Sequence, residues 1–232
     1  MIITSHAACK GHAPENTLAG IRAALRHKAD AIEIDIQLTR DAVPVLLHDR
    51  TVDRTTDGAG RIAELSLRQA RALDAGRGER IPTLREVLAA VAGRALVVLE
   101  IKPSGIEMET LAAVRRAKAL EWCVVHSFRP PVVETVRKLE PKMPASLLVG
   151  GEYVREWREI FALALSINAQ GVAVNHESVT PRLVRAAHLR ELRVSTWTVD
   201  LRRDTRRVYA AGVDAITTDF PDRVRRWLRP PS

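Results

Sequence analysis

The sequence contains few cysteines: only Cys9 and Cys123 occur among its 232 residues. Two cysteines are too few for the disulfide framework that stabilises many small secreted domains, and their spacing does not match a zinc site. The low cysteine content favours a reducing compartment, and we therefore expect a cytoplasmic protein.

Long hydrophobic runs are also absent from the sequence. No segment approaches the roughly 18 apolar residues that a membrane-spanning helix needs. The N-terminal segment, MIITSHAACK, lacks a basic region followed by an apolar stretch, which a secretory signal would have. We expect no membrane span, and a soluble chain whose mature form starts near Met1.

Aromatic residues are scarce, at 4% of the sequence, although basic residues exceed acidic ones and give a net charge of +8. Proteins that bind single strands need aromatic stacking platforms, and nucleic-acid binding in general needs clustered basic residues. The densest basic groups, at 201–207 and 223–229, are interrupted by acidic or apolar residues at helical spacing. We therefore expect no nucleic-acid partner.

What the sequence does contain is enough apolar material, 46% of its residues, to bury one sizeable core, so we expect a single domain over residues 1–232. Short β-rich runs alternate with helix-length amphipathic segments that often open on threonine or proline. The strand candidates are residues 1–6, 30–36, 95–102, 123–128, 145–149, 171–175, 193–199 and 214–219.

Strand alternating with helix eight times predicts an α/β fold with parallel strands covered by helices. At this length a closed (β/α)8 TIM barrel is the favoured arrangement. A doubly wound open sheet is the alternative.

One region departs from this repeat, because an additional β-like run, VPVLLH at 43–48, precedes a stretch rich in glycine and arginine. If the second strand continues through Leu38 and the chain then turns, this run folds back antiparallel to it. That register places His48 beside Asp35, within about one residue. We predict a small insertion after the second strand, at about residues 49–80.

Three carboxylates are predicted to converge in this fold. Side chains alternate along a strand, so Glu33 and Asp35 share one face, and Glu100 and Lys102 share a face near the C-terminal end of the third strand. Barrel active sites gather at that end. A divalent cation would compensate for the repulsion between the carboxylates through hard oxygen ligands. Neutralisation of Glu100 by Lys102, which needs no metal, is the alternative.

Two histidines are candidates for proton transfer. His6 ends the first strand and His48 closes the hairpin, so both are expected near the carboxylates. Histidines that converge on such a cluster can serve as general acid and general base. A structural histidine, packed or hydrogen-bonded, is the alternative for each.

Seven motifs then follow one another along nearly the whole chain. They are His6 with GHAPENT at 11–17, EIDIQLTRDAVPVLLHD at 33–49, RTTDGAG at 54–60, IPTLREVL at 81–88, LEIKP at 99–103, WTVD at 197–200 and GVDAITTDFPD at 212–222. In this order and spacing the sequence resembles the glycerophosphodiester phosphodiesterase family.

The resemblance implies a TIM barrel that hydrolyses a small-molecule glycerophosphodiester to glycerol 3-phosphate and an alcohol, with a bound Mg2+ or Ca2+, or alternatively Mn2+. It places the family's functional residues on positions that are all present here: metal ligands Glu33, Asp35 and Glu100, catalytic histidines His6 and His48, and a phosphate-binding lysine, Lys102. Trp197 matches a tryptophan expected on the glycerol side of the substrate, with a purely packing role as the alternative.

The sequence departs from the family at two motifs. The family usually has His-Arg-Gly where this chain has His6-Ala7-Ala8, which removes a phosphate-binding arginine. Lys10 is close enough in sequence to restore a positive charge, and we predict that it binds substrate, without the planar fork of arginine. Asp200 replaces the family's usual asparagine near the leaving group.

Two other functions stay open from the sequence. A related barrel enzyme that cleaves sphingomyelin or lysophospholipids would share the ligands but would need an apolar mouth for an acyl chain. A non-catalytic barrel that binds phosphodiesters is suggested by the missing arginine. The sequence does not indicate the oligomeric state.

Overall fold

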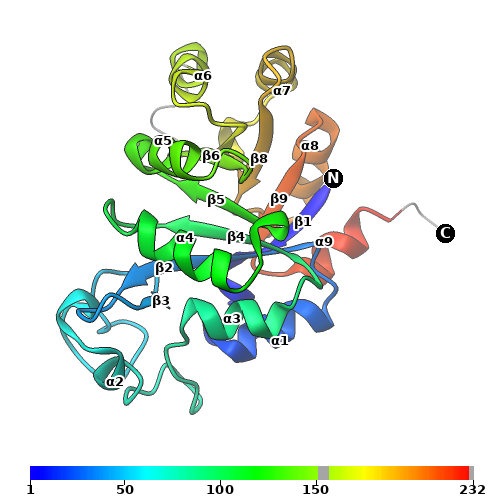
Figure 1. Ribbon diagram of the computed structural model, residues 1–232. Helices are drawn as coiled ribbons and strands as arrows, with labels where there is room; N and C mark the ends of the chain where they lie inside the picture. Colours follow the sequence, from blue (N-terminus) through cyan, green and yellow to red (C-terminus); the bar gives the residue numbers. More distant parts are fainter. Residues whose placement is uncertain (151–156, 230–232) are drawn as a thin grey trace.

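The computed structural model of this chain describes residues 1–150 and 157–229. Within them the strands follow the order β1-β9-β8-β7-β6-β5-β4-β2-β3, and β1 also pairs with β2, so that the sheet closes into a barrel (Figure 1). The strands are β1 (Ile2–Ser5), β2 (Ala31–Leu38), β3 (Pro44–Leu46), β4 (Leu96–Ile101), β5 (Cys123–Ser127), β6 (Ala145–Val149), β7 (Gly171–Asn175), β8 (Arg193–Trp197) and β9 (Ala215–Thr218).

Each predicted strand run contains one strand of the barrel, and the pairings around the barrel are parallel. The predicted TIM barrel is therefore confirmed, and the open doubly wound sheet is excluded. β3 lies outside the closed barrel and pairs antiparallel with β2.

Helices surround the barrel, except for the short α2, which lies in the segment after β3, away from the barrel at the lower left of the view (Figure 1). The helices are α1 (Leu18–Arg26), α2 (Leu67–Ala70), α3 (Leu84–Val91), α4 (Glu107–Arg116), α5 (Pro130–Leu139), α6 (Trp157–Ser166), α7 (Pro181–His188), α8 (Arg202–Ala211) and α9 (Pro221–Trp227). Short 3-10 turns span His6–Ala8, Ile62–Glu64, Leu120–Trp122 and His176–Ser178. None of the helices in these parts of the chain is both long and apolar enough to cross a membrane.

β2 shows how the sequence pattern builds the barrel. Ile32, Ile34 and Ile36 are fully buried in the main apolar cluster, which includes residues of the surrounding helices, and the alternating Glu33 and Asp35 are buried as well. A strand buried on both faces is typical of parallel barrels. The acidic residues of β2 are therefore inside the protein, not on its surface.

The antiparallel hairpin has the predicted register. The ladder pairs Ile36 with Leu46, and the Leu47 N–H donates to the Asp35 carbonyl at 3.1 Å, so His48 follows one residue later. A small apolar cluster joins the insertion to the hairpin, and it is formed by Val45, Leu47, Val52, Ile62, Ala70, Ala75 and Ile81. This cluster gives the segment a defined structure next to the barrel mouth.

Helix α3 provides a test of local stability, because it begins with a reciprocal capping box. The Thr83 hydroxyl accepts from the Glu86 N–H, and the Glu86 carboxylate accepts from the Thr83 N–H. We expect Thr83→Ala to lower the free energy of unfolding by about 1–2 kcal/mol in urea denaturation. The exposed Ser104 is the control, because Ser104→Ala should change it by less than about 0.5 kcal/mol. Equal effects of the two substitutions would contradict the capping role.

Candidate active site

A cavity of about 210 Å3 opens at the C-terminal ends of the barrel strands. It combines titratable side chains with an apolar wall, and its lining residues come from the barrel strands and from the loops that follow strands. The lining residues are His6, Glu33, His48, Glu100, Lys102, His126, Phe128, Leu148, Ala173, Trp197, Thr198 and Thr217. This is the end at which TIM-barrel active sites occur.

The structure brings the three predicted metal ligands together. The ladder between β2 and β4 aligns Asp35 with Glu100, and Glu33 lies on the same face of β2. One carboxylate oxygen from each of the three lies within 4.8 Å of the others. Glu33 and Asp35 are 5% and 1% exposed, so the charges are held away from bulk water.

Lys102 compensates for only part of this negative charge. Its ammonium lies 2.6 Å from a Glu100 oxygen and 3.0 Å from an Asp35 oxygen, so the predicted neutralising pair is present. With all three carboxylates ionised, one ammonium leaves a formal charge of −2, and Glu33 Oε1 is buried without a hydrogen-bond partner among the described residues. A divalent cation fits both the charge and the unpaired oxygen.

Protonation of the cluster follows from the same geometry. Burial, and then the charge of Asp35, raise the pKa of Glu33 to about 8. Burial also raises the pKa of Glu100, although Lys102 opposes that rise. Burial lowers the pKa of Lys102, but Asp35 and Glu100 outweigh it, so the net shift is upward and the ammonium form is favoured. Without a cation the cluster therefore retains protons on its carboxylates.

Both candidate histidines are held by carboxylates through Nδ1. His6 Nδ1 lies 2.7 Å from Asp219 Oδ1, and His48 Nδ1 lies 2.8 Å from Asp49 Oδ1. Burial lowers the pKa of His6, but the hydrogen bond to Asp219 and the charge of Glu33 outweigh it, so the pKa is raised. In each ring Nε2 is then the nitrogen available to a substrate, and Asp219 is an orienting residue that the sequence did not reveal.

The PENT motif, residues 14–17, forms hydrogen bonds that orient residues of the site. Asn16 donates from its side-chain amide to Asp35 Oδ2 at 2.7 Å, and its carbonyl oxygen accepts from the Asp35 N–H. Glu15 accepts two hydrogen bonds from Arg54, which also donates to Asp49. Asn16 of the motif therefore orients the candidate metal ligand Asp35 directly. Glu15 orients Asp49, the partner of His48, through Arg54.

The unusual His6-Ala7-Ala8 segment contributes its backbone to the site. The Ala7 N–H donates to Glu33 Oε2 at 2.7 Å, and Ala7 and Ala8 have φ angles of +43° and +62°. Both alanines are buried, and their methyl side chains supply no positive charge to the site. A left-handed backbone costs roughly 1 kcal/mol for a residue with a Cβ, which glycine at position 8 would avoid.

The predicted substrate residue Lys10 does not line the cavity in the described structure. Its ammonium lies 3.5 Å from Asp219 Oδ2, on the carboxylate that holds His6. Asp200, at the family's asparagine position, accepts from the Asp219 N–H and from the Thr218 hydroxyl. Lys10 and Asp200 therefore both contact Asp219, Lys10 at its carboxylate and Asp200 at its backbone N–H.

Trp197 lines the cavity and also packs. Its indole N–H donates to the Ala173 carbonyl at 3.1 Å, and its ring meets Phe128 edge to face at 5.6 Å. Phe128 is 46% exposed and was not singled out by the sequence. Together the two rings form an apolar wall opposite the charged residues.

His126 is a further lining residue that the sequence left unassigned. It is aligned with Glu100 across the β4–β5 ladder and borders both this cavity and a second one of about 240 Å3 toward the N-terminal ends of the strands. Burial lowers its pKa to about 4, so the imidazole is neutral near pH 7. The alternation of its strand, which puts His126 on the face of Val124 and Phe128, is the signal that could have found it.

Comparison with known proteins identifies the family of this chain. The sequence pattern of the Glycerophosphoryl diester phosphodiesterase family matches residues 6–223. The chain belongs to the glycerophosphoryl diester phosphodiesterase family. The predicted enzyme class, a phosphoric diester hydrolase, is confirmed with it.

Several relatives match over almost their whole length. A glycerophosphodiester phosphodiesterase from Caldanaerobacter subterraneus is 33% identical over 98% of both chains. An Oleispira antarctica phosphodiesterase, solved in complex with the product sn-glycerol-3-phosphate, is 27% identical with a TM-score of 0.88, over 98% of this chain and 96% of that one. A glycerophosphodiester phosphodiesterase structure from Agrobacterium tumefaciens is 26% identical with a TM-score of 0.84, over 96% and 97% of the chains.

The raised pKa of Glu33 predicts how stability depends on pH in the metal-free protein. Between the ordinary pKa of 4.5 and the folded value of about 8, the folded state holds a proton that the unfolded state releases. The free energy of unfolding in EDTA should therefore fall as the pH rises from 5 to 8. Added Mg2+ should reduce this fall, because the cation favours the ionised carboxylates.

Glu33→Gln should flatten the decline, since the amide cannot ionise. The exposed Glu159 is the matched control, and Glu159→Gln should leave the decline as in the parent. Urea denaturation at several pH values measures all three proteins. A free energy of unfolding that rises across this interval would contradict the assignment.

Proposed function

We propose that this chain hydrolyses glycerophosphodiesters to glycerol 3-phosphate and an alcohol, using a bound divalent cation and the pair His6 and His48. The observation that supports this best is the convergence, at one barrel mouth, of two carboxylate-held histidines, three carboxylates and a lysine. A relative of similar fold solved with sn-glycerol-3-phosphate supports the same substrate class.

In this proposal Glu33, Asp35 and Glu100 hold the cation, which is Mg2+, Ca2+ or Mn2+. When bound, the ion supplies positive charge to the nonbridging phosphate oxygens. Lys102 adds a second positive charge at the same wall of the cavity. Negative charge grows on the phosphate during attack. The positive charges of the cation and of Lys102 stabilise it, and this stabilisation is the main source of rate enhancement in the proposal.

The two histidines divide the proton transfers. The raised pKa of His6 favours its protonated form, so His6 donates a proton to the leaving alkoxide. His48 takes the proton from the nucleophile, which is water or the 2-hydroxyl of the glycerol. Attack by the 2-hydroxyl expels the alcohol and gives a cyclic phosphate, which water opens to glycerol 3-phosphate in a second step. Asp219 and Asp49 keep each ring oriented with Nε2 toward the substrate.

The apolar wall of Trp197 and Phe128 faces the carbon skeleton of the substrate. A cavity of about 210 Å3 suits a glycerol phosphate moiety, and the released alcohol then extends toward the exposed Phe128. A glycerol carbon skeleton is enough to cover the apolar wall of Trp197 and Phe128, and a long acyl chain is not needed. We therefore favour glycerophosphodiesters over lysophospholipids or sphingomyelin.

Release of glycerol 3-phosphate from glycerophosphocholine tests the function. We expect activity with Mg2+, Ca2+ or Mn2+ and none in EDTA, and a loss of about 10^2–10^4-fold in kcat for His6→Ala and for His48→Ala. His188 is the control, because it lies on the surface at the end of α7 and His188→Gln should retain the parent kcat.

The contrary results are distinct. Full activity in EDTA would contradict the metal dependence, and unchanged kcat in both histidine variants would contradict the proton transfers. Cleavage of lysophosphatidylcholine or sphingomyelin without cleavage of glycerophosphocholine would replace the proposed substrate. Binding of glycerophosphocholine without any hydrolysis would indicate the non-catalytic barrel.

Lys10 is proposed to replace part of the charge that arginine supplies elsewhere in the family. If it reaches the substrate phosphate, Lys10→Ala should raise KM by about 10-fold, which corresponds to the loss of one charge-assisted contact. The exposed Lys142 is the control, and Lys142→Ala should leave KM unchanged. An unchanged KM with a lower kcat and a shifted pH profile would show that Lys10 acts only through Asp219.

A further inference from the structure

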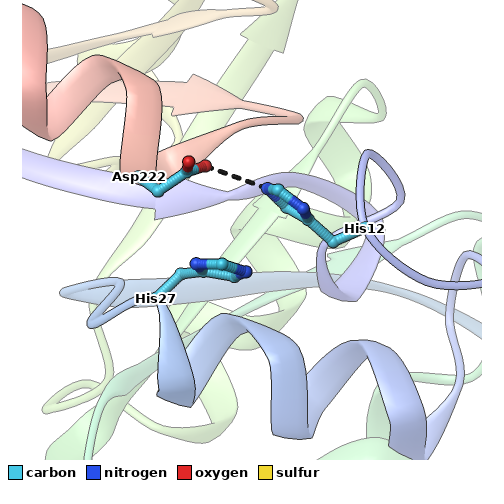
Figure 2. A group of neighbouring side chains, drawn as sticks. All are labelled: His12, His27 and Asp222. Carbon is cyan, nitrogen blue, oxygen red and sulfur yellow. Dashed lines mark hydrogen bonds and ion pairs between the residues drawn. The ribbon is translucent and has the colours of Figure 1, made fainter.

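A second group of potential ligands lies outside the catalytic cavity (Figure 2). His12 comes from the loop that follows β1, His27 caps the C-terminal end of α1, and Asp222 lies in the first turn of α9. His12 Nε2 is 2.9 Å from Asp222 Oδ1, and the two imidazole rings stack with their centroids 4.2 Å apart. One nitrogen or oxygen of each residue lies within 4.8 Å of the others.

The backbone positions of these residues are fixed by the fold. The His12 N–H donates to the Cys9 carbonyl, and the His27 N–H donates to the Ala23 carbonyl. Phe220 contacts the His12 ring edge to face at 5.7 Å, which restricts that ring. Ligand atoms around a tetrahedral zinc ion lie roughly 3.3–3.5 Å apart. The ligand atoms here lie within 4.8 Å of one another and all three side chains are partly exposed, so side-chain rotation is the adjustment that an ion would require.

The donor set indicates the kind of ion. Two imidazoles and one carboxylate match sites for Zn2+ and neighbouring transition metals, whereas Mg2+ and Ca2+ prefer oxygen ligands. Arg226 lies 3.6 Å from the other oxygen of Asp222, but its side chain is 71% exposed and is able to move away.

A simple histidine–aspartate pair elsewhere in the chain provides the comparison. His188 Nε2 lies 2.9 Å from Asp214 Oδ2, the same separation as between His12 and Asp222. In the described residues no third ligand joins His188 and Asp214, whereas His27 joins the other pair. The second imidazole is therefore the feature that separates a potential metal site from a surface ion pair.

We propose that His12, His27 and Asp222 bind one transition-metal ion of the Zn2+ class. The ion would take three protein ligands, with water in the remaining position. It would connect the loop after β1, helix α1 and helix α9, which are distant in sequence. This site is separate from the carboxylates of the catalytic cavity and does not depend on the proposed reaction.

Titration of the full chain with Co2+ tests the proposal, with excess Mg2+ present to compete for the carboxylates. We expect one Co2+ per chain with the visible absorption of a low-coordinate imidazole site, and displacement of Co2+ by Zn2+. His27→Gln should weaken Co2+ binding by more than the roughly 10–100-fold that loss of a mere supporting partner causes. Asp222→Asn, a second variant of similar size, should weaken it as well.

Two controls give the test its specificity. His188→Gln removes a surface histidine of the comparison pair and should leave Co2+ binding unchanged, and so should Glu100→Gln in the catalytic cavity. Zn2+ at about 100 times its Kd should also raise the Tm of the parent by roughly 5 °C, and this rise should be lost in His27→Gln.

Three outcomes would overturn the proposal. The first is no saturable Co2+ binding in the folded parent chain. The second is parent-like Co2+ affinity in both His27→Gln and Asp222→Asn. The third is loss of the Co2+ absorption in Glu100→Gln with retention in His27→Gln, which would assign the ion to the catalytic carboxylates.

Discussion

The burial of three carboxylates at one end of the barrel is the constraint on which the rest of the site depends. Like charges held away from water destabilise one another, so each needs a compensating group. Lys102 pairs with Asp35 and Glu100, the Ala7 N–H serves one oxygen of Glu33, and an amide at the PENT motif serves Asp35. Among the described residues Glu33 Oε1 has no partner, and this oxygen marks where a cation would be most effective.

This constraint also explains why distant segments meet at the barrel mouth. The insertion supplies Arg54, which links Glu15 to Asp49 and through it holds His48. The loop after β9 supplies Asp219, which holds His6. Each histidine is thus oriented by a segment that is not needed to close the barrel. The barrel strands β2 and β4 carry the carboxylates Glu33, Asp35 and Glu100.

Much of this arrangement could be predicted from the sequence because it is periodic. The alternation in β2 predicted that Glu33 and Asp35 would share a face, and the strand count predicted the closed barrel. Roles that depend on long-range pairing could not be predicted in this way. Asp219 is 213 residues from His6, and nothing in its local sequence shows which histidine it contacts. The site of Lys10 likewise depends on a partner that only folding provides.

The loop between β9 and α9 connects the two groups of candidate ligands. Asp219 orients His6 in the catalytic cavity, and three residues later Asp222 pairs with His12 outside it. Oxygen ligands alone select hard ions, whereas paired imidazoles select softer transition metals. A chain with both sets would therefore sort ions by ligand chemistry and not by affinity alone.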